Sequence, residues 1–178
     1  RYVGGGEDWD VVRTGSGNQS DDSNTTAYCM INSGAQSGKM QFIRRVFLLF
    51  DTSSIGAGGT VSAAVMSFTA SSKSEAWGSG DSISVVASNP ASNTALVLAP
   101  DITIDSITAD SSTFNDYTLN STGRDLVSVD GVTKLGCRNS EDNTHSGSLP
   151  HSWITDKANY VALIAADHAS APAPKLVV

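Results

Sequence analysis

The stretch Arg44–Ser74, RRVFLLFDTSSIGAGGTVSAAVMSFTASSKS, decides the fold class of this chain. It predicts one strand that runs into Phe50 and Asp51, a turn over Thr52–Thr60, and a second strand over Val61–Ala70. Half-buried strands require apolar side chains at two-residue spacing, and this stretch mostly supplies it with Phe47, Leu49, Val61, Ala63, Val65 and Phe68. The pattern favours an all-β sandwich and points to no class of enzyme.

Similar short segments recur along the chain, separated by turn signals every ~8–15 residues. We expect strands at Trp9–Thr14, Ala27–Asn32, Met40–Phe50, Ser82–Ala87, Ala95–Ala99, Phe114–Leu119, Val132–Arg138, Tyr160–Ala166 and Lys175–Val178. Asn120 opens a capping sequence that predicts one or two helical turns over Arg124–Val129. About nine or ten antiparallel strands with one short helix predict a jelly-roll-like β-sandwich.

Length and charge narrow the function classes. A chain of 178 residues suits one domain over residues 1–178, in which Arg1–Gly6 is a candidate flexible terminal arm because three glycines follow Tyr2-Val3. The net charge is -7 and no basic cluster exceeds Arg44-Arg45, so we expect no nucleic-acid partner. There is no run of 18 apolar residues, so we expect no membrane insertion. Only 16% of residues are charged, while Ser, Thr, Asn and Gly are abundant, as is typical of extracellular β proteins.

The segment from Arg44-Arg45 through FLLFDTSSI to Thr60–Ala64 resembles the signature strands of DNRLRE-type jelly-roll domains, which read roughly R-x-L-L-x-F-D-L-S-S-I-P and then A-T-I-x-S-A-x-L. Later parts of the chain are similar to the same family at Val86–Val97, Phe114–Val129 and Pro174–Val178. The resemblance covers most of Met40–Val178, and it departs from the family at Gly56, where Pro is usual. It implies a jelly-roll module of secreted, cell-surface or phage proteins with a stalk, adhesion or polysaccharide-associated role. It transfers no catalytic residue.

Catalytic signals are weak. The three histidines, His145, His151 and His168, lie in polar contexts, and the chain has no G-x-S-x-G nucleophile motif. We therefore expect no enzymatic activity. The acidic pairs Asp21-Asp22 and Glu141-Asp142 are expected in polar loops, where they serve solubility and local turn bonding.

The same acidic segments are the candidates for a metal site. Jelly-roll modules often hold a structural calcium ion on loop oxygens, and the oxygen ligands on offer are Asp21, Asp22 and Asn24 in one loop and Glu141, Asp142 and Asn143 in another. Neither run has the D-x-D-x-D-G spacing of an EF-hand. We expect solvated loops and no cofactor, with structural calcium as the alternative.

Two cysteines, Cys29 and Cys137, lie far apart in the sequence. A disulfide between them would close a loop of about a hundred residues, worth ~4–5 kcal/mol in the chain-entropy model. The alternative is a pair of buried free thiols that pack as small apolar side chains. Both readings stay open at the level of sequence.

Sugar recognition needs two or three exposed aromatic rings, because the face of a pyranose stacks on a ring. The candidate glycan contacts are Trp77, in a Gly/Ser loop over Lys73–Gly80, and Trp153, close to Pro150 and His151. Three other aromatic residues lie in predicted strands, where we expect core or interface positions: Tyr28, Tyr117 and Tyr160. The N-x-S/T triplets at Asn18, Asn24 and Asn120 are candidate glycosylation sites if the protein is exported.

These observations favour a non-enzymatic structural protein outside the cell, on the cell surface or on a virion. We expect it to be a repeated subunit of a surface filament, sheath or phage appendage, with further copies of the chain as its partners. Sheet edges and the strand-like termini would carry the contacts, since unpaired edges are templates for strand addition. The alternative is a carbohydrate-binding or adhesion module, with a polysaccharide as partner.

Overall fold

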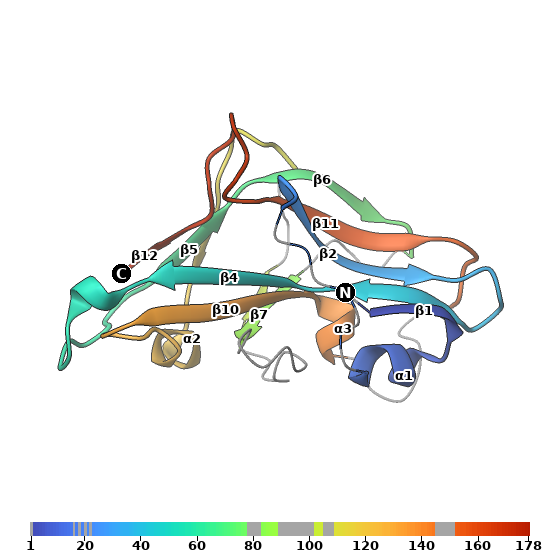
Figure 1. Cartoon of the computed structure of the whole chain (residues 1–178), viewed down its shortest axis with the longest axis horizontal. Helices are drawn as coiled ribbons and strands as arrows, with labels where there is room; N and C mark the ends of the chain where they lie inside the picture. The colour runs from blue at the N-terminus through green and yellow to red at the C-terminus, as the bar shows by residue number, and fades with distance from the viewer. Residues whose placement is uncertain are drawn as a thin grey trace.

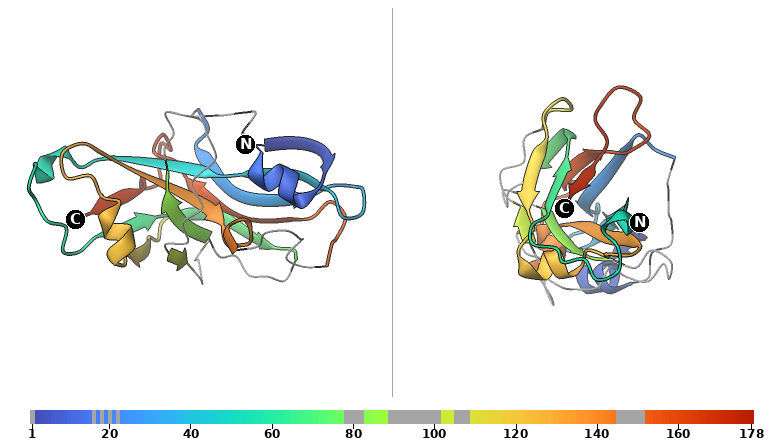
Figure 2. Two further views of the ribbon diagram at one scale, coloured as in Figure 1. Left: turned by 90° about the horizontal axis from the view of Figure 1, so that it is seen from below. Right: turned by 90° about the vertical axis from the view of Figure 1, so that its left-hand side faces the viewer.

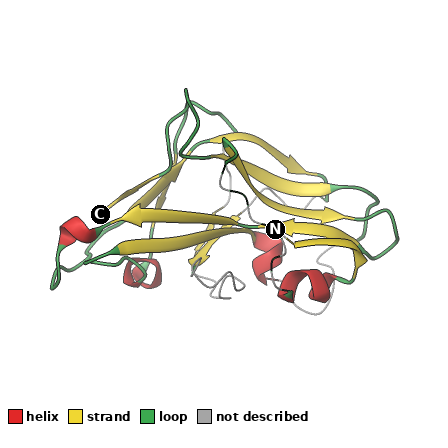
Figure 3. Cartoon of the chain, in the orientation of Figure 1, coloured by secondary structure: helices red, strands yellow, loops and turns green. Residues whose placement is uncertain are grey.

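The computed structural model describes residues 2–15, 17, 19, 21, 23–77, 83–88, 102–104, 109–144 and 152–178. Its strands are β1 (Tyr2–Glu7), β2 (Thr26–Ser33), β3 (Met40–Arg44), β4 (Val46–Asp51), β5 (Val65–Phe68), β6 (Ala70–Glu75), β7 (Ile83–Ala87), β8 (Ile102–Ile104), β9 (Asn115–Thr118), β10 (Val132–Asn139), β11 (Ala158–Ile164) and β12 (Lys175–Val177). The helices are α1 (Trp9–Thr14), the 3-10 helix η1 (Ser53–Ile55), α2 (Ser121–Asp125) and α3 (Ser140–Thr144). The three α-helices lie along the lower side of the molecule in Figure 3.

Within this part of the chain the strands form three antiparallel sheets (Figure 1). Sheet A has the order β1-β3-β2-β11-β6, sheet B the order β4-β10-β7-β8, and sheet C the order β12-β5-β9. The prediction of an all-β sandwich is therefore confirmed, while jelly-roll connectivity stays a prediction.

Two long strands pass from one sheet to another. Arg45 alone separates β3 in sheet A from β4 in sheet B, and Thr69 alone separates β5 in sheet C from β6 in sheet A. Sheets joined by strands that bend at a corner enclose a core between them. Figure 2 shows this arrangement from below and from one end.

The main core lies between the three sheets. Its buried residues include Cys29 and Val161 from sheet A, Leu135 from sheet B, and Met66 and Phe68 from sheet C. From Cys29 onward, buried and half-buried side chains alternate along β2, as the pleat requires, whereas β5, β10 and β11 contain runs of consecutive buried residues. The strong strands expected around Val132–Arg138 and Tyr160–Ala166 are confirmed as β10 and β11, with ends shifted by one or two residues.

A second, smaller cluster lies beneath sheet A and corrects one prediction. Trp9–Thr14 is a helix, not a strand, and it packs Trp9 and Val12 against Ile31 and Ile43. Trp9, Val12 and Arg13 are buried at helical spacing, so as a helix this short segment places them on one face against the sheet. The flexible arm expected over Arg1–Gly6 also differs from the structure. Tyr2–Glu7 is strand β1, which pairs with β3 in sheet A.

Other predicted boundaries of strands and helices differ from those in the structure. The single strand expected over Met40–Phe50 is divided at Arg45, and the one expected over Val61–Ala70 begins only at Val65. The predicted helical turns begin earlier, at Ser121, because Asn120 accepts a hydrogen bond from the Gly123 backbone N–H at 2.8 Å. The strand expected at Ala95–Ala99 lies outside the described residues.

Candidate functional site

The edge strand β4 presents apolar side chains to solvent. Phe47 is 39% exposed and Leu49 is 57% exposed, whereas Val46, Leu48 and Phe50 face inward and contact the core. The sequence-based expectation placed Phe47 and Leu49 on the buried face, and this is wrong. The run VFLLF is apolar on both faces, so its periodicity does not state which face is buried.

The neighbouring strand extends this surface. β10 pairs with β4 so that Val132 lies opposite Asp51 and Lys134 opposite Leu49. Direct partners share a face of the sheet, so Val132, which is also exposed, lies diagonally beside Leu49. We call Phe47, Leu49 and Val132 the β4 patch. β4 is the first strand of sheet B, so the patch adjoins an edge whose backbone has β10 as its partner on one side.

A second apolar edge lies at the end of the described chain. β12 pairs with β5 on one side and is the first strand of sheet C. Leu176 packs against the core, while Val177 is 55% exposed and Val178 is exposed as well. The molecule therefore has exposed apolar residues on the edge strands of two different sheets.

The outer face of sheet A carries a row of half-buried aromatic residues. Met30 lies opposite both Arg44 and Tyr160, and Asn32 lies opposite Phe42, so these side chains share one face of the sheet. The Arg44 guanidinium lies 4.8 Å from the centre of the Phe42 ring and 5.4 Å from that of Tyr28. Tyr28 in turn packs edge-on against Tyr160 at 5.7 Å. Because α1 packs on the opposite face, this row (the sheet A aromatic row: Tyr28, Phe42, Arg44 and Tyr160) faces outward.

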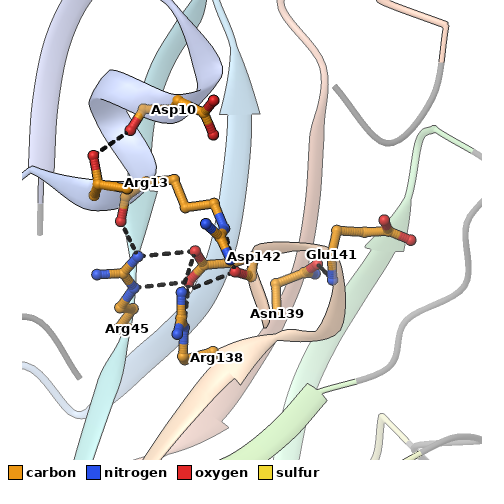
Figure 4. A network of polar contacts seen from close by, with 8 residues as sticks. Asp10, Arg13, Arg45, Arg138, Asn139, Glu141 and Asp142 are labelled. Carbon is orange, nitrogen blue, oxygen red and sulfur yellow. Dashed lines mark hydrogen bonds and ion pairs between the residues drawn. The ribbon is translucent and has the colours of Figure 1, made fainter. Parts of the chain in front are cut away.

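A buried network of three arginines and one aspartate lies between sheet A and sheet B (Figure 4). The Asp142 carboxylate accepts hydrogen bonds of 2.7 and 2.8 Å from Arg45 and two of the same lengths from Arg138. Its backbone carbonyl accepts bonds of 2.8 Å from Arg138 and 2.9 Å from Arg13, and Arg45 donates to the Arg13 carbonyl at 2.7 Å. The network thus connects α1, the β3–β4 junction, β10 and α3.

The charge of Asp142 is held by these contacts. Complete burial would by itself raise the pKa of Asp142, but the hydrogen bonds and charges of Arg45 and Arg138 outweigh it and lower the pKa below its usual value. Desolvation lowers the pKa of Arg13, with the Asp142 charge opposing that shift. Bidentate pairing of this kind fixes geometry strongly, so the network holds the two short helices in place.

The two cysteines lie in the core between sheets A and B. Both thiols are free and fully buried in the same core cluster, and their strands β2 and β10 contact each other. Burial, with the neighbouring Cys137 thiol and the Asp142 charge, raises the pKa of Cys29 well above its usual value. The structure therefore brings together two residues that are far apart in the sequence, and their pairing stays a prediction.

The two tryptophans do not form an exposed platform. Trp77 is only 7% exposed and packs in the cluster beneath sheet A, where its backbone N–H donates to the Asn159 side chain at 2.9 Å. The expectation that Trp77 is exposed in a Gly/Ser loop is therefore wrong. Trp153 is half-buried and donates its indole N–H to the Lys39 carbonyl at 3.1 Å. The burial of Trp77 leaves no exposed ring for a sugar to stack on, and a glycan contact at Trp153 stays a prediction.

The acidic loops are of two kinds. Asp21 caps a local turn through bonds to Ser23, as expected, and these bonds lower its pKa. Glu141 and Asp142 are buried in and around α3, so the expectation of a solvated loop there is wrong. Over the described residues, no three His, Cys, Asp or Glu side chains gather in a way that could hold a metal ion.

The remaining candidates have local roles or lie outside the described residues. His168 accepts backbone N–H bonds from Ser170 and Ala171, which closes a turn. Asn24 and Asn120 are exposed, and the Asn24 amide donates to Asp21. The described ranges exclude Asn18, Asp22, His145 and His151. None of the helices in those ranges is long and apolar enough to span a membrane.

Sequence reasoning missed the arginine–aspartate network and the sheet A aromatic row. The pair Arg44-Arg45 is evident in the sequence, but the Arg44 side chain faces outward, whereas the Arg45 side chain binds the Asp142 carboxylate 97 residues away. Comparison with protein-family models, with curated proteins and with solved structures finds no match for this chain. The resemblance to DNRLRE-type domains therefore stays a prediction, and function has to be argued from the geometry.

Proposed function

We propose that this protein is a non-enzymatic structural subunit that is repeated in an extracellular filament, sheath or phage appendage. The observation that carries the proposal is the β4 patch, in which Phe47 and Leu49 point to solvent from an edge strand. Exposed apolar side chains on an unpaired edge are what monomeric proteins avoid, because such edges pair with other chains.

The second edge explains how contacts could repeat. β4 and β12 belong to different sheets, so a contact between β4 of one copy and β12 of the next leaves an unused edge on each copy. Head-to-tail contacts of this type give rings when the rotation closes and filaments when it does not. The low charged content and many small polar residues support a location on a surface outside the cell.

The proposal is tested by comparing the wild-type protein with Leu49→Glu and with Ile154→Glu as control. Both residues are exposed and apolar, at 57% and 40%, so neither substitution should unfold the subunit. We expect wild-type protein to form regular assemblies in electron micrographs and to sediment faster with rising concentration. Leu49→Glu should remain a monomer of 18.4 kDa, and Ile154→Glu should behave as wild type. A wild-type protein that stays monomeric at high concentration would overturn the proposal.

A second candidate function, carbohydrate binding, is favoured by the sheet A aromatic row rather than by Trp77 and Trp153. Phe42, Tyr28 and Tyr160 come from three adjacent strands and so span ~10 Å, the width of two strand spacings. The Arg44 guanidinium already interacts with the Phe42 and Tyr28 rings, so an uncharged pyranose chain is the ligand class to test.

Calorimetric titration with neutral hexasaccharides tests this second function. Tyr28→Ala and Tyr160→Ala should weaken binding about tenfold, equivalent to ~1.4 kcal/mol, whereas Tyr28→Phe keeps the ring and should keep the affinity. Phe47→Ala removes an exposed ring from another sheet and serves as the control. If no glycan in a broad panel binds, the sheet A aromatic row has a different role.

A further inference from the structure

We propose that Cys29 and Cys137 form a disulfide that links sheet A to sheet B when the protein folds in an oxidising compartment. The two residues come from opposite layers of the core, Cys29 from β2 and Cys137 from β10. Each side chain is fully buried in the same cluster. The strands β2 and β10 contact each other across this core, although the chain separates the two cysteines by about a hundred residues.

Both strands hold their cysteine firmly. β2 is paired on both sides, with β3 and β11, and Cys29 lies opposite Val161. β10 is also paired on both sides, so Cys137 lies between Val46 and Val85. The approach of the two thiols is therefore set by the sheets and not by mobile loops.

Burial decides when the bond can form. Only a thiolate attacks a disulfide, and the native environment of Cys29 disfavours the thiolate. Oxidation therefore precedes closure of the core. One cysteine thiolate attacks a disulfide-carrying oxidant to give a mixed disulfide, and the second cysteine displaces it. Two thiols lose two protons and two electrons, the oxidant leaves as two thiols, and one S–S bond remains.

Once formed, the bond lies out of reach of reductants in the folded protein. In the chain-entropy model, a loop of about a hundred residues lowers the unfolding equilibrium constant by roughly a thousandfold. The oxidised protein should therefore unfold at a higher urea concentration than the reduced protein of the same sequence. This comparison needs no substitution, so it is free of the cavity that a cysteine variant would leave.

The test is refolding of the reduced chain with and without oxidised glutathione, followed by unfolding in iodoacetamide and intact-mass measurement. We expect no alkylated cysteine in the glutathione-treated sample, two in the untreated sample, and a peptide that joins Cys29 to Cys137. Folded reduced protein exposed to oxidised glutathione should acquire the bond far more slowly. Two alkylatable thiols after oxidative refolding, or equal urea midpoints for the two forms, would overturn the proposal.

Discussion

Removing the Asp142 carboxylate should destabilise the protein more than any other single change of a charged group considered for this chain. The substitution Asp142→Asn keeps the size of the side chain but removes the charge that balances Arg45 and Arg138. The two arginine side chains are 13% and 1% exposed, so water cannot replace the missing partner. Four side-chain hydrogen bonds of 2.7–2.8 Å to an ionised acceptor are lost or weakened.

Breaking a buried ion pair by removal of one partner costs ~3–5 kcal/mol, because the other charge stays buried. For a chain of this size, each kcal/mol lowers the melting temperature by ~2–4 °C, so the expected loss is roughly 6–20 °C. Urea unfolding followed by circular dichroism gives the free energy directly. The exposed turn residue Asp167 provides the control, since Asp167→Asn should leave the midpoint unchanged.

A second substitution separates charge from packing. Arg138→Met added to Asp142→Asn should recover part of the lost stability, because it removes one of the charges left without a partner. If Asp142→Asn alone lowers the free energy of unfolding by less than about 1 kcal/mol, the network does not hold α1 and α3 as argued. The same reasoning would then fail for the lowered pKa of Asp142.

Three further predictions concern pH and helix capping. Because the pKa of Asp142 is lower in the folded protein than in the unfolded chain, its contribution to the free energy of unfolding is present above about pH 3.9 and disappears as the pH falls through the folded pKa. The free energy of unfolding should therefore change less with pH below pH 5 in Asp142→Asn than in the wild type. Identical slopes for the two proteins would contradict this. The raised pKa of Cys29 acts in the opposite direction. The free energy of unfolding of the reduced protein should fall above about pH 8.5, where the thiol ionises in the unfolded chain. The disulfide form should show no such fall in the same measurement. Asn120→Ala should cost ~1 kcal/mol in urea unfolding, because the Gly123 N–H loses its acceptor, while Asn120→Asp should retain the stability; equal losses for the two variants would argue against capping.

Much of the fold followed from residue patterns that act locally. The segments that became β2, β7, β10 and β11 alternate or run apolar between turn residues, and backbone pairing in a sheet needs no more specific signal. Asn120 predicted a helix start because a capping side chain acts within three residues. The sequence by itself therefore determined the all-β class and most strand positions.

Tertiary structure decided which faces are buried and which distant residues meet. The run Val46–Phe50 is apolar throughout, so only its pairing with β10 and the packing of Leu48 against the core turned Phe47 and Leu49 outward. Trp9–Thr14 became a helix because sheet A offered an apolar face for Trp9 and Val12. The partners Arg45–Asp142 and Cys29–Cys137 lie about a hundred residues apart, and no local pattern specifies such contacts, because they exist only once the sheets have packed.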